Sequence, residues 1–239
     1  MKLILAGYGK MGHGIEELLR DREDVEILGI VHPGLFESPW DVPGKPDAIV
    51  DFSYPGNLEN VLSRAEDAGA AAVLGTTGYA RDQLRRIAQA AERIPVVHSS
   101  NYSLGVAVLR RAVSLVAPVL LANGFDAEII ETHHNQKADA PSGTAKALLN
   151  AIDPEENFER VYGRVGVPGA RGHEIGIHAV RGGTVAGEHS VLFFGQDEQI
   201  ELRHSAASRR IFAAGAVKAL QFAVGRKPGL YSIDDVLGL

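Results

Sequence analysis

The side chains best suited to chemistry in this chain lie between Glu131 and Ala145, a segment that reads ETHHNQKADAPSGTA. Adjacent His133 and His134 offer imidazoles, which exchange protons readily near pH 7. Lys137 follows four residues after His133 and supplies three N–H donors and a positive charge. This combination indicates proton transfer to a ligand that carries negative charge.

The two histidines end an apolar stretch, and that stretch determines where they point. Ala127, Ile129 and Ile130 predict a strand that ends near His133. Consecutive residues of a strand project to opposite faces of the sheet. One histidine is therefore expected to meet the ligand, while its neighbour meets the protein or a different part of the ligand.

A helix is predicted to follow, opened by Pro141 to Thr144, with Pro141 in its first turn and Ser142 or Thr144 able to cap it. The free N–H groups of a helix start hold anions, and Gly143 lets a ligand approach the backbone closely. We therefore expect a carboxylate or phosphate to be bound jointly by Lys137 and these N–H groups. Taken alone, the four residues fit an ordinary capped helix equally well.

A second motif lies at the N-terminus, where an apolar strand over residues 2–6 runs into Gly7-Tyr8-Gly9-Lys10-Met11-Gly12. This run matches G-x-G-x-x-G. A helical run over residues 15–19 and a second strand over residues 25–31 follow it, which is the context that a dinucleotide-binding turn requires. The motif therefore predicts dinucleotide binding rather than a merely tight turn.

The residue that usually selects the cofactor differs from the common pattern. About twenty residues beyond the glycines, where an acid would hold the adenosine ribose, the chain has His32 and no Asp or Glu from Ile30 to Gly34. No acid is present to repel a 2′-phosphate, and Lys10 lies inside the glycine turn. NADPH is therefore at least as plausible a cofactor as NADH, unless His32 only stacks or faces solvent.

Strands and helices alternate over the first hundred residues, which predicts a parallel, doubly wound sheet. Small polar residues follow the predicted strands at 51–55, 75–78 and 99–103. Each run alone is typical of a surface turn. Because ligands of such sheets bind at the carboxyl ends of the strands, three in succession favour an edge that lines the nicotinamide.

The pattern changes after Tyr102. A long helical run over residues 106–121 precedes the histidine strand, and three alternating segments follow at 174–180, 185–193 and 199–204. Their spacing predicts an antiparallel sheet in a separate α+β domain. A final helix over residues 211–224 is expected to return and pack on the first domain.

Composition narrows the class of protein. The chain has 239 residues, a net charge of −6 and no cysteine, which argues against nucleic acid as a partner and excludes disulfides and thiolate metal sites. We expect a cytoplasmic protein without a membrane partner, because the N-terminus lacks a signal-peptide pattern and the longest apolar stretch, Val113 to Ala122, is shorter than a span of roughly 20 residues.

Metal binding is not expected either. The pairs His133–His134 and His173–His178 project to opposite faces of their strands. Four further polar residues are assigned no role: Arg181, His189, His204 and Arg209.

Together these segments resemble the 4-hydroxy-tetrahydrodipicolinate reductase (dihydrodipicolinate reductase) family. The resemblance spans nearly the whole chain, and its block from His133 to Thr144 is highly specific. Its other parts are residues 7–12, 75–78, 101–106, 187–189, 208–209 and 212–213.

The resemblance implies NAD(P)H-dependent reduction of 4-hydroxy-tetrahydrodipicolinate, via dihydrodipicolinate, to tetrahydrodipicolinate in lysine and diaminopimelate biosynthesis. It implies an α/β fold with a Rossmann-type dinucleotide-binding domain over residues 1–103 and 208–239. Residues 104–207 would form an α+β domain with a mixed or antiparallel sheet, which binds the small dicarboxylate substrate and builds a homotetramer.

The resemblance also implies residue roles. His133 would be the general acid/base and Lys137 the second proton donor, with the substrate dicarboxylate bound by His134, Ser142, Gly143 and Thr144. With His32 added from the reasoning above, the expected cofactor contacts are Gly7, Tyr8, Gly9, Lys10, Met11, Gly12, His32, Gly75, Thr76, Thr77, Ser99, Ser100, Asn101 and Tyr102.

Four alternatives stay open at this point. The protein is compatible with another two-domain reductase of an amino acid precursor, and with a catalytically silent nucleotide-sensing protein. Within the family assignment, His133 and Lys137 are interchangeable as proton donors, and Lys137 is equally suited to act chiefly as a carboxylate clamp.

Overall fold

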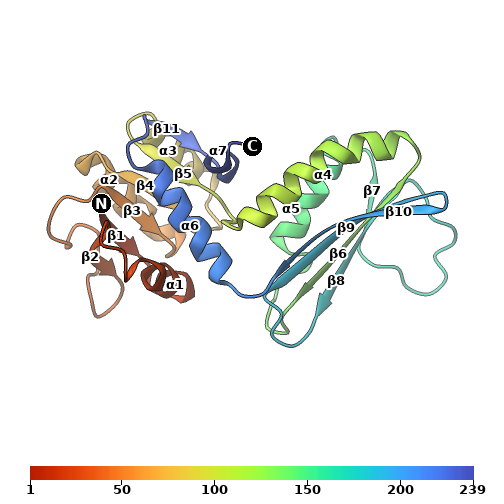
Figure 1. Ribbon diagram of the computed structural model, residues 1–239, viewed down its shortest axis with the longest axis horizontal. Helices are drawn as coiled ribbons and strands as arrows, with labels where there is room; N and C mark the ends of the chain where they lie inside the picture. The colour runs from red at the N-terminus through yellow and green to blue at the C-terminus, as the bar shows by residue number, and fades with distance from the viewer. The chain divides into compact units, whose positions relative to one another are not determined.

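The computed structural model describes residues 1–239 and contains two compact units (Figure 1). The first unit comprises Met1–Leu104 and Arg210–Leu239, and the second comprises Gly105–Arg209. The division expected from the sequence, after residue 103 and before residue 208, lies within two residues of these boundaries. What each unit binds stays a prediction.

The first unit is built on a six-stranded sheet in which all neighbouring strands are parallel. Its order is β11-β5-β4-β3-β1-β2. The strands are β1 (Lys2–Ala6), β2 (Glu26–Val31), β3 (Ala48–Asp51), β4 (Ala71–Leu74), β5 (Pro95–His98) and β11 (Gly229–Tyr231). Because β2 lies on one side of β1 and β3 to β5 continue on the other, the strand order reverses between β1 and β3, the point where ligands of such sheets bind.

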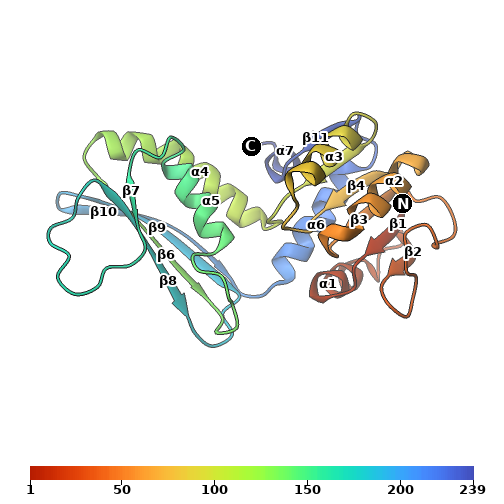
Figure 2. The same cartoon turned by 180° about the vertical axis from the view of Figure 1, so that it is seen from behind.

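Helices cover both faces of this sheet, which explains why its central strands are apolar on both sides (Figures 1 and 2). The helices α1 (Lys10–Leu19) and α6 (Arg210–Ala223) pack on each other, and α6 also packs on β3, β4 and β5. The helices α2 (Leu58–Ala68) and α3 (Arg81–Ala91) contribute to a core on the other face. The predicted return of the final helix to the first domain is confirmed.

The second unit contains a five-stranded sheet with the order β10-β9-β6-β8-β7. The strands are β6 (Asp126–His133), β7 (Glu159–Val161), β8 (Glu174–Arg181), β9 (Gly187–Gly195) and β10 (Glu198–Ala206). The prediction of an antiparallel sheet from strand spacing was wrong for β8, which runs parallel to both β6 and β7, so the sheet is mixed. Only β9 pairs antiparallel with β6 and β10.

One face of this mixed sheet is covered by α4 (Leu104–Ala122) and α5 (Gly143–Ile152) (Figures 1 and 2). Side chains of α4, α5 and the sheet share one core, which includes Val113, Leu148, Ile129 and Phe193. The opposite face carries alternate residues of the same strands and exposes Ile130, Val180 and Phe194. The helices therefore bury one face of the sheet and leave the other available to solvent or a partner.

The helix α4 begins earlier than the apolar stretch measured from the sequence. Its 19 residues are long and apolar enough to cross a membrane by length and composition alone. Leu109, Val113 and Ala117 nevertheless pack in the core of the second unit. Part of its apolar surface therefore serves that core, whereas Val108, Leu115 and Val119 are exposed.

Some short elements were not predicted: the 3₁₀ turn η1 (Pro55–Asn57), β7, β11 and the terminal helix α7 (Ile233–Leu237). Three-residue strands contain too few alternations to give a sequence signal.

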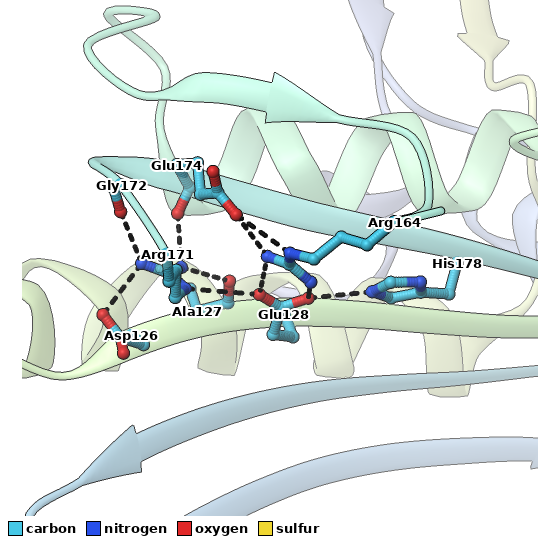
Figure 3. A network of polar contacts seen from close by, with 8 residues as sticks. All are labelled: Asp126, Ala127, Glu128, Arg164, Arg171, Gly172, Glu174 and His178. Carbon is cyan, nitrogen blue, oxygen red and sulfur yellow. Dashed lines mark hydrogen bonds and ion pairs between the residues drawn. The ribbon is translucent and has the colours of Figure 1, made fainter. Parts of the chain in front are cut away.

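The segment between β7 and β8 is held to the sheet by ion pairs (Figure 3). Arg164 contacts Glu128 of β6 at 2.7 Å and also pairs with Glu174 of β8.

Candidate active site

Strand register brings four polar residues together at the end of β6. Glu131 lies opposite His189 of β9, and His133 lies opposite Arg181 of β8. Because side chains of a strand alternate, Glu131 and His133 share the face that α4 and α5 cover. Glu131, His133 and His189 are 0%, 8% and 3% exposed. Three ionisable groups are therefore gathered in a nearly dry environment.

Glu131 is the centre of this cluster. Arg181 donates to both of its carboxylate oxygens, each at 2.8 Å, and the Ser142 N–H donates at 2.9 Å. The His133 Nδ1 atom lies 2.5 Å from the Glu131 Oε2 atom. Burial raises the pKa of Glu131, but Arg181, Ser142 and His133 more than offset this and hold the pKa below its usual range. Glu131 is therefore an anion at neutral pH.

The Glu131 contact fixes the tautomer of His133. An ionised carboxylate only accepts hydrogen bonds, so Nδ1 of His133 carries a proton and Nε2 lies outside this contact, where it is suited to the predicted proton exchange. A Cβ atom built on Gly187 would lie 3.1 Å from this Nε2 atom. Gly187 thus keeps the neighbourhood of the reactive nitrogen free of a side chain.

His189, to which the sequence assigned no role, packs edge-on against His133 with ring centroids 5.1 Å apart. Its Nε2 atom lies 3.2 Å from the Ser142 hydroxyl, and its Nδ1 atom is buried without a partner. Burial, and then the neighbouring His133, lowers the pKa of His189 to about 4. His189 is therefore neutral at pH 7 and contributes no competing charge beside His133.

The start of α5 contacts the same cluster through Ser142. The Ser142 hydroxyl accepts from the Ala145 N–H at 3.1 Å and caps the helix. Pro141 precedes this cap, so the prediction that it occupies the first helical turn was wrong; a cap at Ser142 places the first turn after it. A Cβ atom built on Gly143 would meet nothing within 4 Å. The backbone at the helix start is thus open, as the predicted anion site would require.

Lys137 and His134 lie in the segment between β6 and α5, and each has a neighbour that the sequence did not reveal. Lys137 Nζ pairs with the Asp139 carboxylate at 2.8 Å, which lowers the pKa of Asp139. The Asp139 carbonyl accepts from Arg181 at 2.7 Å. A guanidinium nitrogen of Arg209 lies 2.8 Å from the His134 Nε2 atom. Arg209 therefore adds a cation beside the predicted substrate-binding residues.

The same three residues could also hold a metal ion. Glu131, His133 and His189 each offer one ligand atom, and these three atoms lie within 4.8 Å of one another. Strand register assembles this set from residues far apart in the chain, so the spacing of neighbouring histidines in the sequence gave no sign of it. The bidentate Arg181 pair and the His133 hydrogen bond engage both carboxylate oxygens of Glu131. A cation would have to displace these contacts and approach Arg181.

In the first unit, the three glycines of the N-terminal motif differ in their surroundings. A Cβ atom on Gly7, where φ is +92°, would lie 2.5 Å from the Phe52 carbonyl oxygen, and one on Gly12 would lie 2.2 Å from the Gly7 carbonyl oxygen. A Cβ atom on Gly9 would meet nothing within 4 Å. Two glycines thus permit tight packing and the middle one leaves the backbone open, as pyrophosphate binding at a helix start requires.

The residues predicted to select the cofactor lie around Tyr8. Its ring stacks on His13 with centroids 3.8 Å apart and meets His32 edge-on at 6.0 Å. The Tyr8 hydroxyl donates to Glu16 at 2.6 Å, and this hydrogen bond raises the pKa of Tyr8. His32 and Lys10 are both exposed. Tyr8 and His32 are thus neighbours, and Lys10 lies on the surface of the same turn.

The remaining predicted cofactor residues follow β4 and β5. Thr77 and Ser100 are exposed, whereas Thr76 is buried and donates to Asp51 at 2.8 Å. The Ser99 hydroxyl donates to the Asn101 carbonyl at 2.7 Å.

Tyr102 is only 2% exposed, and its hydroxyl donates to the Leu74 and Val97 carbonyls. The side chains of Thr76 and Tyr102 therefore support the turns from inside, and the Tyr102 carbonyl packs against Gly215 of α6. Their predicted contacts with a cofactor stay a prediction.

The fold and the two clusters define a class of protein. A parallel sheet with a glycine turn at its switch point, joined to a mixed-sheet unit with a buried histidine–carboxylate pair, is typical of nicotinamide-dependent oxidoreductases.

Comparison with known proteins identifies the family. Models for the N-terminus and the C-terminus of dihydrodipicolinate reductase match residues 1–102 and 105–237. The 4-hydroxy-tetrahydrodipicolinate reductase of Brachyspira hyodysenteriae is 43% identical over 239 residues, covering 99% of this chain and all of the relative. The Methanoculleus marisnigri reductase is 41% identical over the full length of both chains. The chain belongs to the dihydrodipicolinate reductase family.

Solved structures agree on the fold. The dipicolinate-bound dihydrodipicolinate reductase from Paenisporosarcina sp. TG-14 superposes with a TM-score of 0.79 at 24% identity, covering 98% of both chains. A probable dehydrogenase from Thermotoga maritima has a TM-score of 0.63 at 12% identity. The two-unit architecture thus occurs at low sequence identity.

Proposed function

We propose that the protein is a 4-hydroxy-tetrahydrodipicolinate reductase, which forms tetrahydrodipicolinate via dihydrodipicolinate with NAD(P)H in lysine and diaminopimelate biosynthesis. The observation that carries this proposal is the buried Glu131–His133 pair beside the open start of α5. Family membership supports the same reaction. When bound, the nicotinamide cofactor supplies the hydride.

The residues of the second unit supply the proton that accompanies the hydride. His133 donates from Nε2 to a ring atom of the substrate, so that one hydride and one proton together reduce one conjugated double bond. Glu131 stabilises the protonated imidazole, and Arg181 holds Glu131 in place. Neutral His189 packs on the ring without adding charge.

The two carboxylates of the substrate are matched by cations and by the helix start. Lys137 is released from Asp139, or shared with it, as a carboxylate binds, and it acts as a clamp or as the second proton donor. Gly143, Thr144 and the backbone at Ser142 form the anion-binding end of α5. His134 contributes a further contact to the dicarboxylate.

Cofactor choice depends on the surroundings of Tyr8. Lys10 carries a positive charge and is exposed, and His32 is exposed at the end of β2. No acidic residue occupies the position of His32, where one would repel a 2′-phosphate. We therefore expect NADPH to be used at least as well as NADH. His32→Asp should lower the rate with NADPH relative to that with NADH by about tenfold, from lost attraction and added repulsion at the 2′-phosphate. An unchanged ratio would refute this role.

The uncovered face of the mixed sheet fits assembly into a homotetramer. Ile130, Val180 and Phe194 are exposed on adjacent strands of this face. Apolar side chains grouped on a sheet face are typical of an interface between subunits. One chain has a mass of 25.5 kDa, and light scattering should give four times this mass. The mass of a monomer would contradict the homotetramer. A cytoplasmic location is consistent with the absence of cysteine.

Activity is tested by following loss of reduced-cofactor absorbance with substrate generated in situ from pyruvate and aspartate semialdehyde. Turnover that requires the condensation product supports the proposal. Turnover only with another amino acid precursor would favour a different reductase. Cofactor binding without any turnover would favour a nucleotide-sensing protein.

A further inference from the structure

Asp51, the last residue of β3, has a fully buried carboxylate at the carboxyl end of the parallel sheet. All its hydrogen-bond donors are neutral. They are the Ser53 N–H at 3.1 Å, the Ser53 hydroxyl, the Thr76 hydroxyl at 2.8 Å and the Tyr79 hydroxyl at 3.2 Å. The carboxylate is thus satisfied without a cation.

Packing stability alone gives a weak reason for such a residue. Burial of a carboxylate without a counter-ion is unfavourable, and burial raises the pKa of Asp51 against the opposing effect of its four donors. An apolar side chain would fill a buried strand end at lower cost. Asp51 is therefore better explained by what its donors do.

The donors of Asp51 come from two successive turns. Ser53 follows β3, whereas Thr76 and Tyr79 follow β4, the neighbouring strand. Burial and the nearby Asp51 charge raise the pKa of Tyr79, so its hydroxyl keeps the proton that it donates. One buried carboxylate thus ties the turn after β3 to the turn after β4.

Phe52 packs between these turns and the glycine motif. A Cβ atom on Gly75 would lie 2.0 Å from the Phe52 ring, and one on Gly7 would lie 2.5 Å from the Phe52 carbonyl oxygen. The turns after β1, β3 and β4 therefore form one packed edge at the switch point of the sheet.

We propose that Asp51 is a positioning residue for the cofactor, which holds the Gly75–Gly78 turn in its binding conformation through the hydroxyls of Thr76 and Tyr79. Asp51 does not itself touch the cofactor, because its side chain is fully buried. The inference rests on the proposed use of NAD(P)H. It adds a residue outside the glycine motif to the determinants of cofactor affinity.

Asp51→Asn tests this role, because the amide keeps the size of the carboxylate but directs two N–H donors toward hydroxyls that need an acceptor. We expect the Kd for NADPH, measured by quenching of its fluorescence, to rise about tenfold from the loss of one or two hydrogen bonds. The KM for NADPH should rise in parallel, while kcat at saturation changes less than about threefold. Tyr79→Phe removes one donor and should raise Kd by a smaller factor, about threefold.

Glu66→Gln is the matched control. Glu66 lies on α2 of the same unit and pairs with Arg86 at 2.8 Å, away from the strand-end turns. This variant should lower Tm without changing Kd or kcat. A drop in Tm for Asp51→Asn with Kd within twofold of wild type would reveal a structural role only and overturn the proposal.

Two further outcomes separate this inference from the proposed function. If Asp51→Asn fails to fold, Tyr79→Phe and Thr76→Val each remove one donor to Asp51 and replace it in the test. A Kd for NADPH that is unchanged in both variants would overturn the role of Asp51. Wild-type protein that binds NADPH but does not turn over the dipicolinate precursor would refute the reaction, while a raised Kd in the variants would still support Asp51.

Discussion

Glu131→Gln is the substitution that best separates catalysis from folding at the candidate active site. Glutamine keeps the size of glutamate and one acceptor oxygen, but it removes the charge that faces His133 at 2.5 Å and Arg181 at 2.8 Å. The protonated form of His133 then loses a charge-assisted hydrogen bond. The proton transfer step should therefore slow.

The magnitude follows from the contact that is lost. A hydrogen bond to a charged group contributes about 1.5 to 3 kcal/mol, and each 1.36 kcal/mol in the barrier is a tenfold change in rate. We therefore expect kcat to fall by about 10- to 100-fold. The KM for NADPH should stay the same, because Glu131 belongs to the other unit.

Stability should fall as well, because Arg181 loses its partner. Breaking a buried pair costs about 3 to 5 kcal/mol, and the Arg181 side chain is 20% exposed, so about 2 to 3 kcal/mol is expected. Urea unfolding measures this loss.

Glu128→Gln is the control for the activity effect. Glu128 lies on the same strand but on the other face, where it pairs with Arg164 and His178. It should lose stability with kcat unchanged. Equal loss of kcat in the two variants, or a kcat within twofold of wild type for Glu131→Gln, would refute the role of Glu131.

Three further predictions concern the substrate clamp, the glycine motif and pH. Lys137→Ala should raise the KM for substrate at least about tenfold in steady-state assays, since it removes a carboxylate partner, and an unchanged KM would exclude the clamp. Gly12→Ala should fail to fold, because its Cβ atom would lie 2.2 Å from the Gly7 carbonyl oxygen, whereas Gly9→Ala should keep its Tm but bind NADPH weakly. Thermal unfolding and fluorescence titration measure the two effects, and identical behaviour of the two variants would contradict this prediction. The pKa of His189 falls from 6.5 to about 4 on folding, because the buried ring is held neutral. The part of the unfolding free energy that depends on this neutral ring is fully present above pH 6.5. It is lost as the pH falls to about 4, a change of about 3 kcal/mol. His189→Asn should flatten the dependence of the unfolding free energy on pH over that range, and an identical slope in wild type and variant would count against it.

Local patterns explain which parts of the fold could be predicted. The alternation of strands and helices in the first unit and the presence of a long helix before β6 depend on residues close together in the chain, and the structure confirms both. The parallel pairing of β8 with β6 depends on a crossover through α5 and β7. Strand spacing contains no information about that crossover, so spacing alone predicted antiparallel pairing, whereas the mixed sheet that the resemblance allowed is confirmed.

The candidate site divides in the same way. His133 and Lys137 were found because they lie in one dense segment. Arg181 and His189 lie beside His133 because of the pairing of β8 and β9 with β6. The sequence shows which residues of each strand share a face, but it does not show which strands pair. Glu131 lies in that same dense segment and shares a face with His133 at the period of two along the strand, and these two signals together could have identified it.

Whether His133 donates the proton in this reduction is tested by cofactor oxidation in wild type and in His133→Gln, with substrate condensed in situ from pyruvate and aspartate semialdehyde. We expect turnover that requires the condensation product and falls at least about 100-fold in the variant, with the Kd for NADPH unchanged. Turnover by His133→Gln at the wild-type rate, or none by wild type despite NADPH binding, would contradict this expectation.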